Sequence, residues 1–298
     1  MVIVRLAGGL GNQLFQYAAG RALAERHGVP LRLDLTHLAR DPLRSYRLDR
    51  FQIAATVATP AEVARLTHAD AGRLLAKGFS FLQRYLPPAR RAIFVQRQDD
   101  FDPRFTALSG HVYLIGYFQS PRYFAHMADQ IRMELTLREP PDALNRALLE
   151  AITSCAAVSV HVRRGDYLTN PLYRDICTPG YYRAAMREIA ARVDAPHFFV
   201  FSDDIAWAQD NLRIAYPVTY VSHNGPARDH EDLRLMQHCH HHIIANSSFS
   251  WWGAWLATRR GQIVIAPPRW LNVAAREPYA LIPESWIRIS GATGKEDH

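Results

Sequence analysis

The sequence has 298 residues, 48% of them hydrophobic, and can therefore bury substantial cores in one large domain or in two of about 150 residues. It contains no run of about 18 apolar residues and no basic leader with a cleavage site. Cys155, Cys177 and Cys239 lie far apart, which argues against a disulfide framework and a cysteine metal site. We therefore expect a cytoplasmic protein with at most peripheral membrane association.

The net charge of +7 comes mostly from arginine, because Lys77 and Lys295 are the only lysines. The planar guanidinium suits phosphate and carboxylate groups, so a phosphorylated ligand, a nucleic acid or an anionic surface could each explain the excess. A compositional bias spread over the surface explains it equally well. No Lys/Arg run with interleaved aromatic residues occurs, and we therefore expect no nucleic-acid partner.

Short β-branched segments alternate with helical ones in both halves, which is typical of α/β domains with mostly parallel sheets. In the first half, residues 2–6, 31–35 and 111–117 are predicted strands. Residues 12–27 are a predicted amphipathic helix. Pro121 is expected to begin another helix, because proline is favoured in the first helical turn.

The second half repeats this alternation more clearly. Strands are predicted at residues 156–162, 197–201, 218–221, 242–245 and 262–266, and helices at residues 181–192, 205–212, 231–238 and 249–257. The Arg-Glu-Pro-Pro segment at residues 138–141 is the expected linker. The sequence thus predicts an α/β protein with an N-terminal domain of residues 1–140 and a C-terminal domain of residues 141–298.

A glycine-rich turn between the first strand and helix reads Gly8-Gly9-Leu10-Gly11-Asn12-Gln13. Such a turn lets the backbone approach a ligand, and the helix start offers N–H groups to an anion or an acceptor sugar. With Asp34 it also resembles part of a dinucleotide fingerprint, although Leu14 occupies the third glycine position. A NAD(P)-dependent oxidoreductase or a nucleotide-sugar epimerase is therefore the alternative function, and a tight turn without a ligand is the structural alternative.

The strongest motif follows the strand predicted at residues 156–162 and reads His161-Val162-Arg163-Arg164-Gly165-Asp166-Tyr167. Open α/β sheets bind ligands at the carboxyl ends of their strands. Two arginines near a core are costly unless an anion compensates them, and consecutive side chains point in different directions. We expect one arginine to bind a diphosphate and the other to pair with Asp166 or brace the loop. An internal Arg–Asp salt bridge that closes the loop is the alternative.

Two further motifs follow later strands. Ser202 or Asp203 could cap the next helix, or a carboxylate of the Ser202-Asp203-Asp204 segment could accept hydrogen bonds from a nucleobase or ribose. Residues 245–250 place small polar side chains before a helix whose start could bind a second phosphate. Trp251, Trp252 and Trp255 are expected to pack in the core. A non-catalytic carbohydrate-binding protein that stacks sugars on them is the alternative.

Two segments that resemble metal sites are interpreted as structural. The run His238-Cys239-His240-His241-His242 adjoins an apolar strand, where neighbouring residues turn to opposite faces. Asp100-Phe101-Asp102 matches the D-x-D pattern of metal-dependent glycosyltransferases, but Pro103 indicates a plain turn. We therefore predict no metal site.

The four motifs occur in order between Met1 and about Pro268, and together they resemble the bacterial α-1,2-fucosyltransferases of glycosyltransferase family 11. The resemblance implies a GT-B fold with two Rossmann-like domains facing a central cleft, the first on the acceptor side and the second binding GDP-fucose. It implies inverting, metal-independent transfer of L-fucose from GDP-β-L-fucose to the 2-hydroxyl of a galactose-terminated glycan, such as an oligosaccharide or an O-antigen unit. No cofactor besides the donor is implied.

The resemblance also assigns residues by position. Arg163 corresponds to the essential arginine that binds the β-phosphate, with Arg164 beside it. Asp166 is the candidate base, or else it holds Arg164. The other expected donor-binding residues are His161, Asp203, Asp204, Asn246, Ser247, Ser248 and Phe249. The expected acceptor-side loop contains Gly9, Gly11, Asn12 and Gln13.

Overall fold

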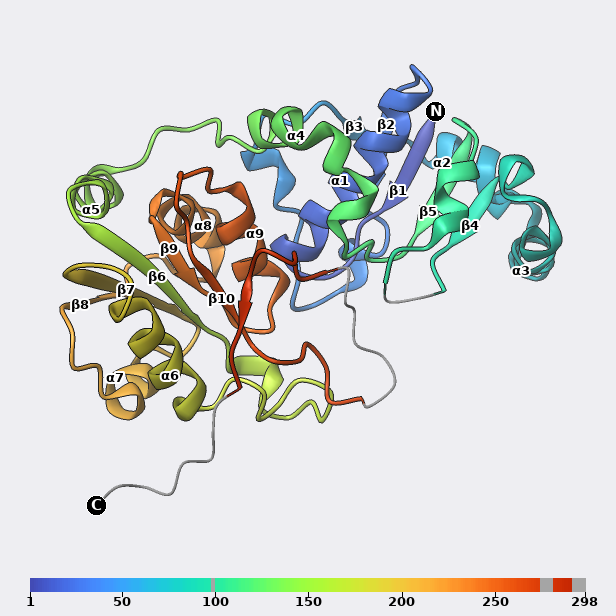
Figure 1. Cartoon of the computed structure of the whole chain (residues 1–298). Helices are drawn as coiled ribbons and strands as arrows, with labels where there is room; N and C mark the ends of the chain where they lie inside the picture. The colour runs from blue at the N-terminus through green and yellow to red at the C-terminus, as the bar shows by residue number, and fades with distance from the viewer. Residues whose placement is uncertain (98–99, 274–280, 291–298) are drawn as a thin grey trace. The chain divides into compact units, whose positions relative to one another are not determined.

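A computed structural model describes residues 1–97, 100–273 and 281–290 (Figure 1). The chain divides into two compact units, of which the first comprises Met1–Arg138 together with Leu281, and the second begins at Glu139. Among the described residues, the named strands pair only in parallel, as the alternation of strands and helices predicts. In the same residues, none of the helices combines the length and the hydropathy that a membrane span requires.

The first unit contains a sheet whose strand order, in the residues described, is β3-β2-β1-β5-β4. Its strands are β1 Val2–Arg5, β2 Leu31–Asp34, β3 Thr56–Val57, β4 Ile93–Val95 and β5 Val112–Ile115, and its helices are α1 Leu10–Arg26, α2 Pro60–Thr67, α3 Arg73–Leu82 and α4 Ala128–Glu134. The three predicted strands of this half are confirmed to within two residues. β3 and β4 were not predicted, because two or three residues are too few to show a period.

Helix α1 packs closely on this sheet through small residues. A Cβ atom on Gly20 would lie only 2.3 Å from Cγ2 of Val4 in β1 and 3.0 Å from Cδ1 of Leu31 in β2. The helix begins at Leu10, two residues before the predicted start, because Gly9 already serves as its N-cap. The glycine-rich turn therefore leads directly into the helix.

The helix expected at Pro121 is replaced by a short 3-10 turn, Pro121–Tyr123. Ser120 caps this turn by accepting a hydrogen bond from the Arg122 N–H. The turn ends at Phe124, whose φ of −140° is not helical, and α4 begins only at Ala128. The proline thus starts a helical turn as expected, but the backbone at Phe124 prevents its continuation.

The second unit contains a sheet whose strand order, over the described part of the chain, is β11-β10-β9-β6-β7-β8. Its strands are β6 Ala156–Val162, β7 Pro196–Ser202, β8 Val218–Val221, β9 His241–Ile243, β10 Val264–Ala266 and β11 Ile287–Arg288, and its helices are α5 Ala143–Thr153, α6 Pro179–Ala190, α7 Ile205–Leu212, α8 Asp229–His238 and α9 Ser248–Leu256. The five strands and four helices predicted for this half are confirmed, with end shifts of no more than two residues.

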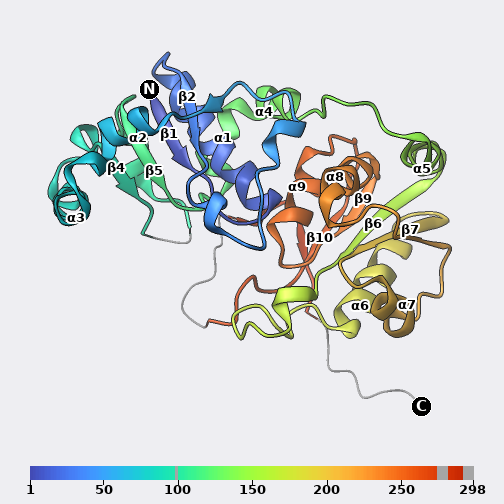
Figure 2. The ribbon, with the colours of Figure 1, turned by 180° about the vertical axis from the view of Figure 1, so that it is seen from behind.

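Both faces of the second sheet are covered. Val158 of β6 packs with Tyr181 of α6 on one face, whereas Ala157 and Phe199 pack with Leu235 of α8 on the other. Figures 1 and 2 show α6 and α7 on one side of this sheet and α8 and α9 on the opposite side. Two covered faces explain why these strands are continuously apolar rather than alternating.

Helix α5 follows the expected linker and was not predicted. Asp142 caps it by accepting a hydrogen bond from the Asn145 N–H at 2.9 Å. An aspartate just before an apolar periodic segment is a helix-start signal, so Asp142 could have predicted this helix. The helix places Ile152 in the core beneath α8.

Candidate functional site

Three polar segments of the second unit converge at one edge of its sheet. Strand β6 lies between β7 and β9, and its register aligns Val162 with Ser202 and Val160 with Ile243. The residues that follow these strands therefore emerge side by side, because parallel strands end at the same edge. This edge brings together the arginine, aspartate and serine motifs.

Arg163 lies between two carboxylates. Its Nη2 is 2.5 Å from Oδ1 of Asp166, and its Nη1 is 3.0 Å from Oδ2 of Asp203. Burial acts to lower the pKa of the guanidinium, but Asp203 and Asp166 outweigh it and raise the pKa above its ordinary value. The arginine is therefore a fixed positive charge, and its side chain remains 23% exposed.

Arg164 makes a different set of contacts. Its backbone N–H donates to Oδ1 of Asp203 at 2.9 Å, and its Nε donates to Oδ2 of Asp204 at 3.1 Å. The guanidinium carbon lies 3.8 Å from the ring centroid of Trp207, which is a cation–π contact. Asp204 also caps α7 by accepting from the Trp207 N–H at 3.1 Å. Arg164 thus fastens the loop to the start of α7.

This geometry corrects two expectations. Asp166 pairs with Arg163, although Arg164 is its expected partner, because the loop turns after Gly165 and brings Asp166 back over the first arginine. The charges of both arginines are balanced by Asp166, Asp203 and Asp204, so the arginines do not by themselves require a bound anion. The internal salt bridge considered as an alternative is present.

His161, two residues before Arg163, is a buried and neutral ring. It is 6% exposed, and its ring centroid lies 5.4 Å from that of Phe249. Burial, helped by the charge of Arg163, lowers the pKa of His161 to about 3. Its Nδ1 is buried without a hydrogen-bond partner among the described residues. A neutral donor or acceptor therefore lies within the arginine motif.

The segment before α9 is mainly structural. Asn246 is 2% exposed, and its amide donates to the carbonyls of Tyr173 and Trp270 at 3.3 and 3.2 Å. Ser247 caps α9 by accepting from the Phe249 N–H at 3.3 Å. Ser248, which begins the helix, is half-buried. The structure thus makes Asn246 a brace for the loop and places the start of α9 beside the arginine motif.

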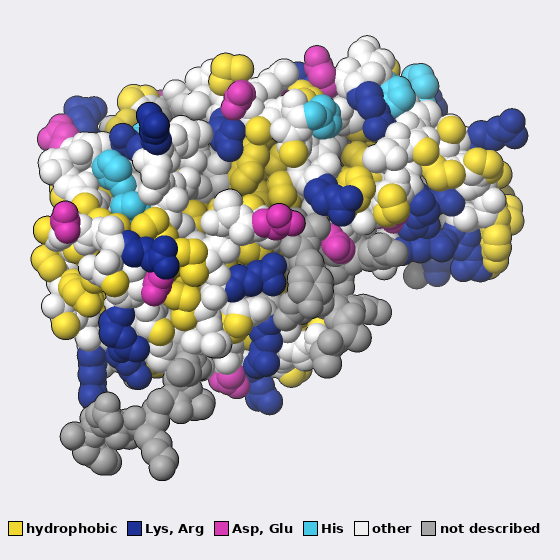
Figure 3. Space-filling model, in the orientation of Figure 1, with side chains coloured by type: hydrophobic (Ala, Val, Ile, Leu, Met, Phe, Trp, Pro, Cys, Tyr) yellow, Lys and Arg dark blue, Asp and Glu magenta, His cyan; other side chains and the backbone are white. Residues whose placement is uncertain are grey.

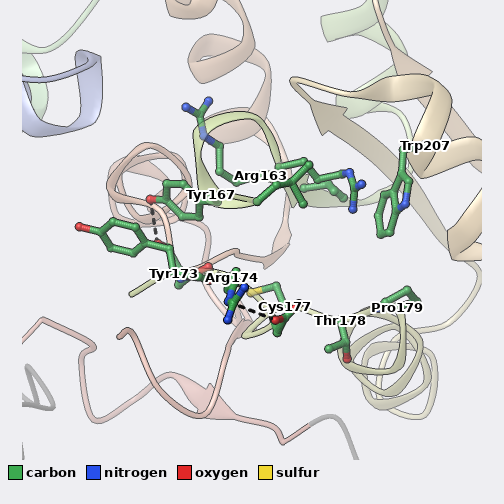
Figure 4. A pocket seen from close by; sticks show the side chains of 13 residues that line it. Arg163, Tyr167, Tyr173, Arg174, Cys177, Thr178, Pro179 and Trp207 are labelled. Carbon is green, nitrogen blue, oxygen red and sulfur yellow. Dashed lines mark hydrogen bonds and ion pairs between the residues drawn. The ribbon is translucent and has the colours of Figure 1, made fainter. Parts of the chain in front are cut away.

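A cavity of about 220 Å³ lies next to these residues within the second unit. It is lined by Val162, Arg163, Arg164, Tyr167, Leu168, Tyr173, Arg174, Asp175, Cys177, Thr178, Pro179, Trp207 and Asn246. Figure 4 shows the rings of Tyr167 and Tyr173 side by side on one wall, with Cys177 and Thr178 beyond them. The two tyrosine rings stack at 4.6 Å between centroids.

Most of this lining lies outside the sequence motifs. Trp207 and the segment 172–179 lie outside the motifs, and only their packing against the arginine loop reveals them. Asn272 holds this segment by donating to the carbonyls of Pro171 and Arg174 at 3.0 and 2.7 Å. A single asparagine far along the chain carries no signal that could have predicted this role.

In the first unit, Gln13 supports the glycine-rich turn from within. It is fully buried, and its amide donates to the carbonyls of Gly8 and Ser45 at 3.0 and 2.9 Å. Its side-chain oxygen accepts from the Arg47 N–H at 3.0 Å. The structure therefore gives Gln13 a bracing role rather than a surface for a ligand.

The other residues of this turn differ from Gln13. Gly9 has an ordinary φ of −73°, and a Cβ atom there would lie 3.7 Å from the nearest side-chain atom, on Arg44. Gly11 is buried, and Asn12 accepts a hydrogen bond from Gln119 at 2.7 Å. The space and the backbone angle at position 9 would therefore accept a side chain larger than that of glycine. The acceptor-side assignment of Gly9, Gly11 and Asn12 stays a prediction.

The dinucleotide alternative loses the support of Asp34. Asp34 is 2% exposed, and its carboxylate accepts hydrogen bonds from the Thr36 N–H and hydroxyl and from the Tyr113 hydroxyl, the last at 2.5 Å. A ribose-binding acid would have to face the ligand. Leu14, in place of the third glycine, is fully buried in the core.

The residues that resemble metal ligands are used internally. Asp102 is 1% exposed, pairs with Arg104 and caps a 3-10 turn. His242 is fully buried, and its Nδ1 lies 2.8 Å from Oγ of Ser159. Over the described ranges, three His, Cys, Asp or Glu side chains nowhere gather so that they could hold a metal ion.

Trp251 and Trp252 lie in the core as predicted, whereas Trp255 is only half-buried. Trp251 and Trp252 are fully buried, and their ring centroids lie 5.1 Å apart in an edge-to-face arrangement. Trp255 stacks on Trp251 at 5.8 Å. The buried rings of Trp251 and Trp252 offer no face to a sugar, so the carbohydrate-stacking alternative has no support from these two residues.

The chain matches known glycosyltransferases over most of its length. Residues 95–290 match the model of glycosyl transferase family 11. An α-1,2-colitosyltransferase of Escherichia coli is 33% identical, over 97% of this chain and 99% of its own length. The galactoside 2-α-L-fucosyltransferase Sec1 of Mus musculus is 28% identical, over 99% of this chain and 75% of its own.

Among solved structures, an Arabidopsis thaliana FUT1 variant in complex with GDP matches with a TM-score of 0.51 at 13% identity. The match covers 96% of this chain and 75% of that one. At this identity the likeness concerns the fold alone. Together with the two Rossmann-like parallel sheets, it confirms the predicted GT-B type of fold.

Gly165 tests the arrangement of the arginine loop. A Cβ atom there would lie 2.6 Å from Oδ2 of Asp203, so Gly165→Ala must displace the carboxylate that holds Arg163 and Arg164. We expect thermal denaturation to show a loss of about 1–2 kcal/mol in the free energy of unfolding. Gly225→Ala is the matched control, because a Cβ atom there meets nothing within 4 Å. Equal stabilities of the two variants would contradict the arrangement.

Proposed function

Because the chain belongs to glycosyl transferase family 11, we propose that it is an inverting, metal-independent galactoside α-1,2-fucosyltransferase. It transfers L-fucose from GDP-β-L-fucose to the 2-hydroxyl of a galactose on an oligosaccharide or an O-antigen-type glycan. Its partners are this donor and a galactose-terminated acceptor, and it needs no further cofactor.

The relatives support this proposal through their names. The Escherichia coli relatives include an α-1,2-colitosyltransferase and an O-antigen biosynthesis glycosyltransferase, WbnK, which is 32% identical. The mammalian relatives are galactoside α-1,2-fucosyltransferases. All the named linkages are α-1,2, so the linkage is the best supported part of the proposal. The names include both a colitosyltransferase and fucosyltransferases, so the donor is the part that we test directly.

The observation that carries the mechanism is the placement of Arg163. Its guanidinium is a fixed cation at the carboxyl end of β6, beside the start of α9. During transfer, the bond between C1 of fucose and the β-phosphate oxygen breaks, and its electron pair passes to that oxygen. A cation already held in position stabilises this charge without having to reorganise.

Arg164 helps to hold Arg163 in place. Its contacts with Asp203, Asp204 and Trp207 fix the backbone from which Arg163 extends. The start of α9, capped by Ser247, adds the partial positive charge of a helix N-terminus. These groups supply the charge stabilisation that a divalent cation supplies in metal-dependent transferases.

The acceptor hydroxyl attacks C1 from the face opposite the departing phosphate and must lose its proton. Asp166 is the most exposed of the three aspartates that pair with the two arginines, with 47% of its side chain exposed. Its 2.5 Å contact with Arg163 favours a bracing role over that of a base. A strongly dissociative transition state also demands little help from a base.

Replacing Arg163 tests the phosphate assignment. We expect Arg163→Ala to lower kcat by about 100- to 1,000-fold, because it removes a donor to the departing phosphate. Arg163→Lys should recover part of the activity, since it keeps the charge but loses the fork. Arg187→Ala, on an exposed part of α6, is the control. Wild-type turnover in folded Arg163→Ala would contradict the assignment.

Asp166→Asn separates a brace from a base. If Asp166 only holds Arg163, the amide should lower kcat/KM by about fivefold at every pH and leave the shape of the pH–rate profile unchanged. If Asp166 is the base, the acid limb of the profile should disappear. The measurement is kcat/KM between pH 4 and 9, taken relative to the wild type.

The donor is tested by comparing GDP-fucose with GDP-colitose in the presence of excess chelator. Colitose lacks the 3-hydroxyl of fucose, and a site that hydrogen-bonds this hydroxyl rejects the deoxy sugar by a large factor, up to about 10⁴. We expect higher kcat/KM for GDP-fucose, undiminished by the chelator, and an α-1,2 linkage in the product. Preference for GDP-colitose would overturn the donor, and activity restored only by a divalent cation would overturn metal independence.

A further inference from the structure

The segment 71–97 of the first unit concentrates the positive charge of the chain. It carries Arg73, Lys77, Arg84, Arg90, Arg91 and Arg97 and contains no acidic residue. Its charge of +6 compares with +7 for the whole chain. The excess of positive over negative charge is therefore concentrated in this segment. These residues belong to the first unit and are not among those that line the cavity of the second unit.

Helix α3 is attached to the first unit by one face. Phe79 packs against Ile93 and Tyr113 of the sheet, and its ring lies 4.1 Å from that of His68. Four residues later, Gln83 is 5% exposed and accepts a hydrogen bond from the Ala92 N–H at 2.7 Å. Residues four apart lie on the same side of a helix, so these contacts define its inner face.

The opposite side of this helix is apolar and uncovered by the described residues. Its members are Leu74, Leu75, Phe81, Leu82 and Tyr85, which are 85%, 68%, 50%, 61% and 68% exposed, and we call them the outer face of α3. Their spacing of seven residues, from Leu74 to Phe81 and from Leu75 to Leu82, makes one stripe along the helix. Figure 3 shows hydrophobic side chains adjoining Lys and Arg side chains over this end of the first unit.

Basic side chains border this stripe. The guanidinium carbon of Arg84 lies 3.3 Å from the ring centroid of Phe81, and its Nη2 donates to the Tyr85 hydroxyl at 2.8 Å. Lys77 of the same helix is exposed, and so is Arg90 in the following 3-10 turn, Pro88–Arg90. An apolar stripe with aromatic rings, bordered by long cationic side chains, suits the boundary between lipid headgroups and acyl chains.

We propose that the outer face of α3 docks onto a membrane surface that contains anionic phospholipids. The leucines and Phe81 enter the headgroup region, while Lys77, Arg84 and Arg90 pair with lipid phosphates. A second copy of this chain fits less well, because the same surface would bring six more positive charges and no acidic partner. The proposal is independent of the donor sugar.

Vesicle sedimentation tests the proposal. The full chain should bind vesicles of phosphatidylcholine with about one third phosphatidylglycerol, and it should bind pure phosphatidylcholine much more weakly. The double variant Leu74→Glu/Phe81→Glu should lower the affinity for the anionic vesicles by about tenfold or more. Leu144→Glu is the control, because Leu144 is 65% exposed on α5, outside the outer face. Unchanged melting temperatures would show that both proteins are folded.

The charges are tested separately by Lys77→Gln and Arg90→Gln. Each should weaken binding to the anionic vesicles by about fivefold, and added salt should weaken the wild type in the same way. Equal binding to neutral and anionic vesicles, or full binding by Leu74→Glu/Phe81→Glu, would overturn the proposal. A wild-type dimer in solution that this double variant abolishes would assign the face to a second copy and overturn it as well.

Discussion

The carboxylate of Asp203 is the contact on which the site of the second unit depends. One of its oxygens accepts the backbone N–H of Arg164 at 2.9 Å, and the other lies 3.0 Å from Nη1 of Arg163. This contact exists because β6 and β7 are parallel and in register up to Val162 and Ser202. Gly165 is required beside it, since any Cβ atom there would displace the carboxylate.

A site with internally compensated charges differs from a bare cationic patch. Holding two arginines near a core without partners would be expensive, and the three aspartates remove most of that cost. Arg163 is therefore oriented before any ligand arrives. For a reaction in which negative charge collects on a departing diphosphate, a cation already in place is more effective than one that must move.

Several residues expected to touch a ligand instead hold the structure together. Gln13 and Asn246 are buried, and both use their amides to bridge backbone segments. Asp204 caps α7 while it pairs with Arg164. Family motifs combine such braces with residues that face the ligand, because a precise site needs both. A motif in a sequence does not distinguish between them, whereas burial and hydrogen-bond partners do.

The sequence by itself determined the local elements and the family. The strand at residues 156–162 and the helix at residues 205–212 match β6 and α7 without a shift, because long apolar runs and helix caps are local signals. The four ordered motifs identified the family that the comparisons confirm. The strands β3, β4 and β11 were missed, since two or three residues show no period.

Only the tertiary structure decided which charges pair. Asp203 and Asp204 lie about forty positions from the arginines that they hold, and their pairing follows from strand register and not from spacing along the chain. The same holds for Trp207 against Arg164 and for the outer face of α3, whose exposure depends on Phe79 and Gln83 turning inward. Local propensity acts over a few residues, whereas partners across a sheet or on a helix face are chosen by packing.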